Sequence, residues 1–279
     1  MFCEQLRYHL LFRWFLDMEM LEEAFDASTF SQNRERLLRH DVRAQFLGAV
    51  VGQAKAAGLL SAEHFRVDGT LIEAWASAKS FRPKDEDGGD GNGWGDFSGT
   101  TRSNETHESK TDPEAKLARK GNGREAKLCF AAHAMMENRN GLVVQMQVSD
   151  ANGHAERDVA LDLIAAVASE RGRVTVGADK GYDTRDFVRG CRERGATPHV
   201  AQNEHARRRS AIDGRTTRHE GYAVRQRIRR CIERIFGWVK VIGGLRRTRF
   251  EGRNRTQLAA TMVAAAYNLL RMSRLLAVS

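Results

Sequence analysis

Two aspartates follow apolar runs that have the length and composition of β-strands. Asp68 comes after Phe-Arg-Val within residues 64–77, and Asp179 comes after Val-Thr-Val-Gly-Ala within residues 173–182. Carboxylates at the carboxyl edge of a mixed sheet can project into a shared crevice, where two of them can bind a divalent cation through hard oxygen ligands. An aspartate close to a glycine at the end of a strand is also typical of a turn, so each residue taken alone has a purely structural interpretation.

A third acid lies in a segment with helical spacing. Within residues 226–240, Arg229, Glu233 and Lys240 are separated by four and seven positions, which places them on one face of a helix. The apolar residues of the segment would anchor this helix to a sheet; they are Ile228, Ile232, Ile235, Phe236 and Val239. The alternative is an ordinary arginine–glutamate pair on a solvated helix face.

Hydrophobic periodicity predicts the elements that must position these acids. Apolar residues recur every three or four positions from residue 1 to about 60, which predicts a helical region. Residues 64–77 predict a strand that ends in a turn at Asp68–Gly69. The remaining elements are expected to be strands at 127–137, 141–149, 173–182 and 197–200, a turn at 138–141, and helices at 156–170, 184–194 and after the basic segment. The predicted order, β-β-β-α-β-α-β-α, is that of a ribonuclease-H-like α/β fold with a mixed sheet.

The charge of the chain is concentrated in one segment. The 279 residues have a net charge of +9 and a pI near 9.7, which favours a polyanionic partner such as nucleic acid. Residues 201–255 contain 16 Lys or Arg against five acids, so this surplus of +11 leaves −2 for the rest of the chain. We expect the segment to contact phosphates, which supply affinity without sequence specificity; a solvated basic face is the alternative.

Other sequence features exclude several classes of site and location. The four cysteines are widely scattered and the histidines have no metal-binding spacing, so neither a disulfide scaffold nor a zinc site is expected. The start of the chain lacks the apolar core of a secretory signal, and no apolar run approaches 18 residues, so we expect a soluble, intracellular protein without a membrane partner.

Residues 81–114 hold nine acids and four bases and are glycine-rich around 85–99, which predicts a flexible acidic insertion.

Several ordered blocks of the sequence resemble the DDE transposases of bacterial insertion sequences, in the IS4/IS5 grouping and closest to the IS5 family. The resemblance extends from about residue 3 to the C-terminus and is carried by VDGTLIEAWAS, GADKGYDTRDFV, TPHVAQN, RTTRHEGYAV and RRCIERIFGWVK. It implies a ribonuclease-H-like catalytic domain, which we expect over 63–279 after a helical N-terminal region over 1–62. The acidic triad implied by the resemblance consists of Asp68, Asp179 and Glu233.

The resemblance further implies an enzyme that cleaves DNA at insertion-sequence ends and joins the 3′-OH to target DNA with two Mg²⁺ ions, for which Mn²⁺ can substitute. Asp68 would bridge the two ions, and Asp179 and Glu233 would each complete one site. The implied partners are the terminal inverted repeats, the target DNA and a second copy of the chain, in the bacterial cytoplasm at the nucleoid. The expected DNA contacts are Arg229 and Lys240 of the Arg-Glu-Lys signature, together with Lys180, Arg207, Arg208, Arg209, Arg215, Arg218, His219, Arg246, Arg247 and Arg249.

The sequence departs from the family pattern in three ways. The pattern has Tyr three residues before Arg229, where this chain has Gln226, and it has Pro and Ser where this chain has Glu220 and Arg225. Such proteins also have more sequence before the segment that begins here at MFCEQL, so we expect a truncated N-terminal region. Two other functions therefore stay open: a truncated remnant that occupies element ends or interferes with an intact transposase without cleaving DNA, and a nuclease of the same fold that does not transfer strands.

Overall fold

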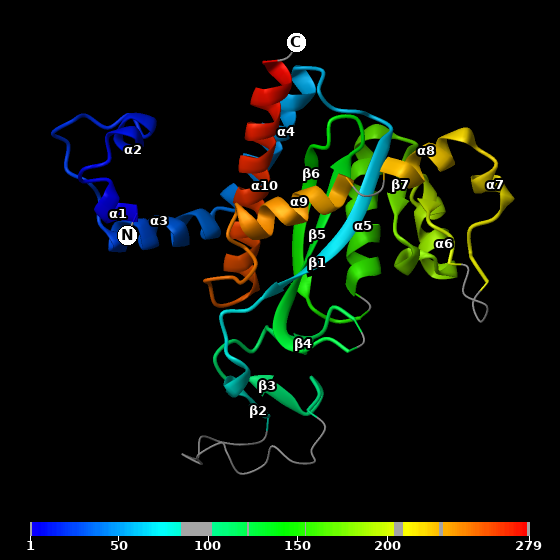
Figure 1. Cartoon of the computed structure of the whole chain (residues 1–279), viewed down its shortest axis with the longest axis horizontal. Coiled ribbons are helices and arrows are strands. Elements are labelled where there is room, and N and C mark those ends of the chain that lie inside the picture. Colours follow the sequence, from blue (N-terminus) through cyan, green and yellow to red (C-terminus); the bar gives the residue numbers. More distant parts are fainter. Residues whose placement is uncertain are drawn as a thin grey trace. The chain divides into compact units, whose positions relative to one another are not determined.

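The computed structural model describes residues 2–84, 102–121, 123–153, 155–203, 209–228 and 231–277 (Figure 1). The chain divides into two compact units, Met1–Gln45 and Phe46–Ser279. The boundary expected after residue 62 stays a prediction.

The first unit is helical, as its apolar periodicity predicts. A buried arginine holds its start together: the guanidinium of Arg13 donates to the carbonyl of Leu6 at 2.8 Å and also to the carbonyls of Glu19 and Glu22. These bonds tie the first two helices to the turn that follows them. The helices of this part of the chain are α1 (Phe2–Gln5), α2 (Leu10–Phe15), α3 (Ala27–Arg39) and the start of α4 (Val42–Ala56).

The second unit is built on a mixed sheet whose strands come from six segments. They are β1 (His64–Glu73), β4 (Lys116–Ala118), β5 (Lys127–Glu137), β6 (Val143–Asp150), β7 (Val174–Ala178) and β8 (Ala196–Val200). The sheet has the order β4-β5-β1-β7-β8, and β6 also pairs with β5. The pairings of β5 with β1 and β6 are antiparallel, whereas β1, β7 and β8 run parallel. Three antiparallel strands followed by two parallel ones confirm the ribonuclease-H-like fold.

One local prediction is wrong, because β1 does not end in a turn at Asp68–Gly69. The strand continues to Glu73, and its ladder with β5 sets Asp68 opposite Ala134 and Gly69 opposite His133. A long antiparallel partner thus overrides the local preference of an Asp-Gly pair for a turn.

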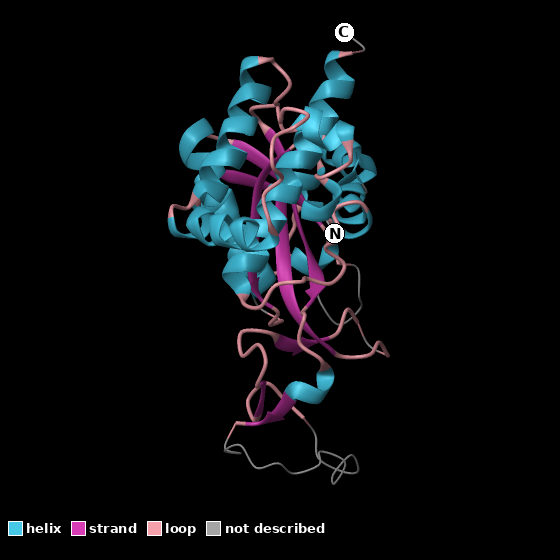
Figure 2. Ribbon diagram, turned by 90° about the vertical axis from the view of Figure 1, so that its left-hand side faces the viewer, coloured by secondary structure: helices cyan, strands magenta, loops and turns pink. Residues whose placement is uncertain are grey.

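Helices cover both faces of the sheet (Figure 2). On one face, α5 and α6 pack over a core that includes Phe65, Val67 and Ile164. On the other face, α9, α10 and the end of α4 pack over a core that includes Ile72 and Ile235. The helices and short turns of this unit are α5 (Ala155–Arg171), α6 (Arg185–Glu193), α7 (Gly214–Thr217), α8 (Glu220–Ile228), α9 (Cys231–Val241), α10 (Arg253–Leu276) and the 3₁₀ turns Ala78–Ser80 and Lys180–Tyr182.

The acidic insertion begins and ends in paired strands. β2 (Phe81–Pro83) and β3 (His107–Ser109) form an antiparallel pair, so the two ends of the insertion lie side by side. Residues 85–101 lie outside the described part of the chain.

The last helix is fixed to the sheet through the backbone of an edge strand. The side-chain amide of Asn268 on α10 accepts the N–H of Val143 at 2.8 Å and donates to the carbonyl of the same residue at 2.7 Å. Asn268 is fully buried, and its side chain takes the place of a neighbouring strand, which β6 does not have at this point within the described residues. In the described part of the chain no helix, α10 included, combines the length and apolarity that a membrane span requires.

We predict that Asn268→Ala lowers the free energy of unfolding by about 2–4 kcal/mol, because it leaves a buried N–H and a buried carbonyl without partners. Urea unfolding followed by circular dichroism measures the change, with Asn254→Ala, an exposed asparagine of the same helix, as the control. Equal stability of the two variants would contradict this role for Asn268.

Candidate active site

Asp68 and Asp179 lie where two parallel strands separate. The pairing of β1 with β7 ends at Arg66 opposite Gly177. Asp68 comes two residues after Arg66 and Asp179 comes two residues after Gly177, so both acids are on the same side of the sheet as that last pair. The negative charge of Asp179 acts on Asp68, which places the two carboxylates close together.

Backbone N–H groups orient both carboxylates. Asp68 accepts the N–H of Gly69 at 2.8 Å. Asp179 caps the 3₁₀ turn Lys180–Tyr182 and accepts the N–H of Gly181 at 2.7 Å. A Cβ at residue 181 would lie 2.9 Å from Oδ1 of Asp179, so glycine is needed for this close approach. The predicted end of the strand at Ala-Asp-Lys-Gly is confirmed, and the turn it starts holds the acid in place.

A fourth carboxylate, Glu156, comes from the first turn of α5. Tyr182 is buried, and its hydroxyl donates to Oε1 of Glu156 at 3.1 Å. The same oxygen lies 2.7 Å from the place a Cβ on Gly69 would take, so the absence of a side chain there makes room for it. Sequence analysis missed Glu156 as a site residue, because an acid in the first turn of a helix is usual and the contact joins residues far apart in the chain.

Glu233 lies in the first turn of α9. The apolar face predicted for this helix is confirmed where side chains are described, and it packs on the sheet through Ile232, Ile235, Phe236 and Val239. This packing directs the start of α9 to Asp68, and the charge of Glu233 acts on that carboxylate. Asp179 and Glu233 of the predicted triad therefore each lie within electrostatic reach of Asp68.

The partly buried Asp68 lies among three exposed carboxylates, and their negative charges act on it. Burial is the largest cause that raises the pKa of Asp68 from 3.8 to about 7, although the N–H of Gly69 opposes the shift. The charges of three neighbours raise it further: Asp179, Glu156 and Glu233. Burial also raises the pKa of Glu156, even though one side of it is open to solvent. A divalent cation would relieve this repulsion, and carboxylate oxygens are the ligands that Mg²⁺ prefers. Within the described residues, however, no three acidic, histidine or cysteine side chains are already closed around an ion position.

Some of the predicted DNA contacts lie along the same elements. Lys180 directly follows Asp179 and is exposed. Lys240 is half-buried in the last turn of α9, seven residues after Glu233. Burial lowers the pKa of Lys240, and the charges of Lys120 and Arg246 contribute to the same shift.

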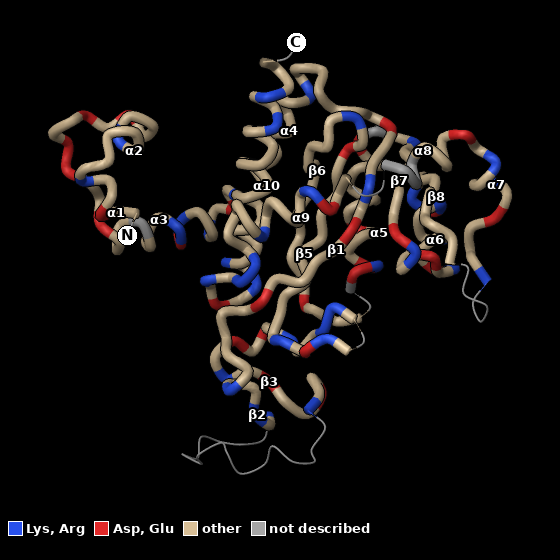
Figure 3. Tube along the Cα trace, viewed as in Figure 1, with Lys and Arg blue, Asp and Glu red and all other residues tan. Residues whose placement is uncertain are grey.

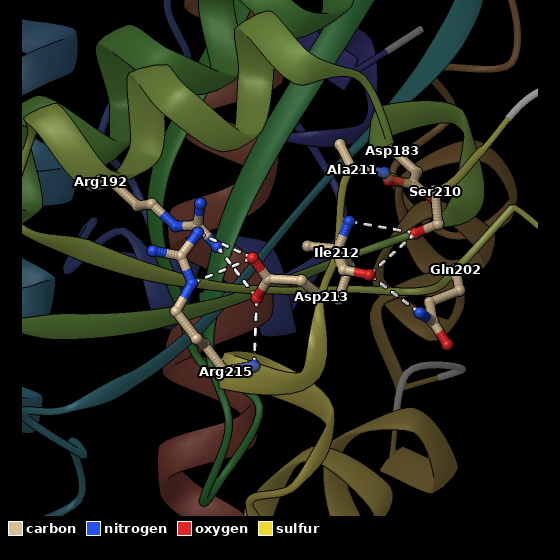
Figure 4. Close-up of polar contacts among 8 residues, drawn as sticks. All are labelled: Asp183, Arg192, Gln202, Ser210, Ala211, Ile212, Asp213 and Arg215. Carbon is tan, nitrogen blue, oxygen red and sulfur yellow. Dashed lines mark hydrogen bonds and ion pairs between the residues drawn. The ribbon is translucent and has the colours of Figure 1, made fainter.

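Other residues of the basic segment have partners within the protein. Asp213 binds Arg215 at 2.7 Å and Arg192 at 3.7 Å, and these contacts hold the start of α7 (Figure 4). Arg247 donates to the carbonyls of Ala74 and Trp75 at 3.0 and 2.6 Å and lies over the indole ring.

Lys and Arg positions recur along the described part of the basic segment, as the trace in Figure 3 shows. The exposed members of the predicted DNA-binding set are Arg209, Arg215, Arg218, His219, Arg246, Arg247 and Arg249. Arg207, Arg208 and Arg229 lie outside the described residues, as does the side chain of Gln226.

Two family models match the chain. A family model described as Transposase DDE domain matches residues 65–269, and a second model described as a transposase domain matches residues 1–36. No curated protein matches the sequence significantly.

Two solved structures are similar to the chain at low identity. One is a piggyBac transposase synaptic complex with hairpin DNA, at 8% identity and a TM-score of 0.35, covering 75% of this chain and 48% of that one. Another is the Mos1 transposase paired-end complex with the left transposon end, at 9% identity and a TM-score of 0.26, covering 81% and 61%. The chain thus spans about half to three fifths of these proteins.

We predict that Asp68→Asn stabilises the protein in the absence of divalent ions. The folded state holds the Asp68 proton up to about pH 7, whereas the unfolded chain releases it near the usual value of 3.8. Below pH 4 Asp68 is protonated in both states and does not lower the free energy of unfolding. As the pH rises from 4 to about 7, the unfolded chain ionises and the folded state does not, so the free energy of unfolding falls progressively. At pH 8 we expect a gain of about 2–4 kcal/mol, which disappears at pH 4.

Thermal unfolding in EDTA at both pH values measures this gain. Asp162→Asn, which changes an exposed aspartate of α5, is the control and should be neutral at both. A variant less stable than wild type at pH 8 would show that Asp68 is not under electrostatic strain.

Proposed function

The chain belongs to the transposase DDE domain family, and on this premise we propose that it cleaves DNA at the ends of an insertion sequence and joins the freed 3′-OH to target DNA. The observation that supports this most is the meeting of Asp68, Asp179, Glu156 and Glu233, brought by four different elements, at the point where β1 and β7 separate. Three neighbouring carboxylates act on Asp68, and the positive charge of Arg157 offsets part of this crowding at Glu156 only. Such strain is typical of an active site.

The carboxylates fit the divalent ions that this reaction would use, Mg²⁺ or Mn²⁺ in its place. Asp68, which is influenced by the other three acids, would hold both ions, and Asp179 and Glu233 would each hold one. When bound, such a pair of ions activates the attacking water or 3′-OH and stabilises the leaving oxygen.

The surrounding residues would keep these ligands in place before DNA arrives. The N–H groups of Gly69 and Gly181 fix the orientation of the two aspartates. The buried hydroxyl of Tyr182 stays protonated, because burial raises its pKa well above the usual value, and it holds Glu156 beside Asp68. Preorganised ligands lose little freedom when the site is loaded.

Cations on both sides of the carboxylates would bind the DNA backbone. Lys180 follows Asp179, and Lys240 follows Glu233 along α9, so each acid has a basic residue beside it or on the same helix. We propose the same role for Arg229 and for the exposed arginines of the basic segment. Because the two ends of an element have to be brought together for joining, the active form would be a homodimer.

We predict that Asp179→Asn lowers the rate of Mg²⁺-dependent cleavage of DNA with inverted-repeat ends by at least about 10³-fold, since it removes a ligand charge while keeping the Gly181 contact possible. DNA binding should be retained. Gel assays of cleavage and binding measure both, and Asp162→Asn serves as the control. Equal cleavage by Asp179→Asn would remove this residue from the site, and binding without cleavage by the wild type would favour the remnant. Cleavage without joining would favour a nuclease.

We predict that Glu156→Gln weakens Mg²⁺ binding by about 10-fold, because it keeps the acceptor for Tyr182 but removes one negative charge from beside Asp68. Isothermal titration of the DNA-free protein measures this affinity. Tyr182→Phe, which keeps the charge and removes only the hydroxyl, should change it less. An unchanged affinity in Glu156→Gln would assign Glu156 a structural role only.

A further inference from the structure

A cavity of about 450 Å³ opens beside the far half of β1, away from the four carboxylates. Its walls come from β1, β5, α9, the end of β4 and loop residues 120, 124, 125 and 246. The residues that line it are Leu71, Glu73, Ala118, Lys120, Arg124, Glu125, Lys127, Cys129, Lys240 and Arg246.

The cavity is strongly cationic. Five lysines and arginines line it against two glutamates, a net charge of +3. One of the five is neutralised, because Lys127 binds Glu73 at 3.0 Å. Among the described residues no ion pair involves the other four cations, which are Lys120, Arg124, Lys240 and Arg246. Because Glu73 is paired with Lys127, these four cations share only the charge of Glu125 within the lining, and a bound anion would offset their surplus charge.

Lys240 is the most buried of these four cations, and the neighbouring positive charges affect its pKa. Lys240 is half-buried, and its pKa is lowered by burial and by the charges of Lys120 and Arg246. Its ammonium group is therefore partly desolvated and lies near other cations, and the charge of Glu73 opposes the shift only in part. A phosphate oxygen would accept hydrogen bonds from this ammonium group and would add negative charge beside it.

Two elements lead from the carboxylates to this cavity. On α9, Glu233 and Lys240 are seven residues apart, which is about 10 Å at the helical rise. On β1, Asp68 is followed by Leu71 and Glu73, about 10–16 Å along an extended strand. The two routes give separations of about 10 Å and about 10–16 Å, which correspond to a few nucleotides of a DNA strand.

The edge of β1 between these two places has no strand beside it in the described part of the chain. Its pairing with β7 ends at Arg66, and the next pairing on that edge is a bridge from Glu73 to Arg247. A DNA strand placed along this edge would have carboxylates at one end and the cationic cavity at the other.

We propose that this cavity binds one backbone phosphate of the DNA strand, a few nucleotides from the phosphodiester that the carboxylates attack; this inference rests on the proposed function. The contact positions the strand and is independent of base sequence. Lys120 and Arg124 are its least expected members, because they lie outside the basic segment and in none of the family-like blocks.

The test uses the full-length double variant Lys120→Gln and Arg124→Gln, both of which are exposed and outside the core. The matched control is the double variant Arg173→Gln and Arg274→Gln, which removes two other exposed charges and has the same net charge. Dissociation constants are measured for duplexes with inverted-repeat ends over a series of salt concentrations. We expect the first variant to bind about 10-fold more weakly and to lower the slope of log K against log[salt] by about 1, with little change in the control.

A second measurement locates the phosphate. Neutral methylphosphonates are placed one at a time at the first several positions next to the cleavage site. One of them should weaken binding by the wild type clearly more than binding by the double variant, in which only Lys240 and Arg246 remain to hold the phosphate. If every position weakens both proteins equally, the cavity does not hold a strand phosphate.

The outcomes separate this proposal from the proposed function. Cleavage by the wild type together with equal DNA binding by the two double variants overturns the cavity proposal alone. Loss of inorganic phosphate binding in the first variant with unchanged DNA binding assigns the cavity to a free anion and overturns it too. Absence of both cleavage and DNA binding in the wild type overturns the function itself.

Discussion

The structure depends on holding like charges together at the place where β1 leaves β7. The last pair of that parallel ladder, Arg66 and Gly177, fixes the register from which Asp68 and Asp179 follow. Phe65, Val67 and Ile72 of the same strand are almost completely buried, and each contributes about 1.5–3 kcal/mol to stability. Together they exceed the cost of ionising one partly buried aspartate, which is a few kcal/mol. The core of β1 thus stabilises an arrangement that its own carboxylate opposes.

The order of the main elements could be predicted from the sequence because each signal was local. Apolar periodicity and turn residues identified the hairpin of β5 and β6, the helix α5 and the strands β7 and β8. The prediction failed where tertiary pairing outweighs a local preference, as at Asp68–Gly69 within the long ladder between β1 and β5. The short strands β2, β3 and β4 were also missed, since three residues carry too little pattern to identify a strand.

The site was predictable only in part for a related reason. Asp68, Asp179 and Glu233 stand at positions where sequence signals or family-like blocks single them out. Glu156 belongs to the same cluster through Tyr182, a contact between residues 26 apart in the chain that no spacing rule contains. Lys120 is an exposed lysine in a loop, and only the fold brings it near Lys240.

The basic segment shows why net charge overstates a binding surface. Arg247 uses its guanidinium on two backbone carbonyls and an indole ring, and Arg253 binds both Glu114 and Asp150, so part of the surplus serves the fold. Cations that lack such partners are more informative, because nothing inside the protein accounts for their gathering. In a transposase the carboxylates would repel the DNA backbone if they acted alone. The proposed phosphate site, whose Lys240 lies about 10 Å along α9 from Glu233, would offset that repulsion without neutralising the carboxylates themselves, so attraction for the strand and affinity for divalent ions could coexist on one sheet.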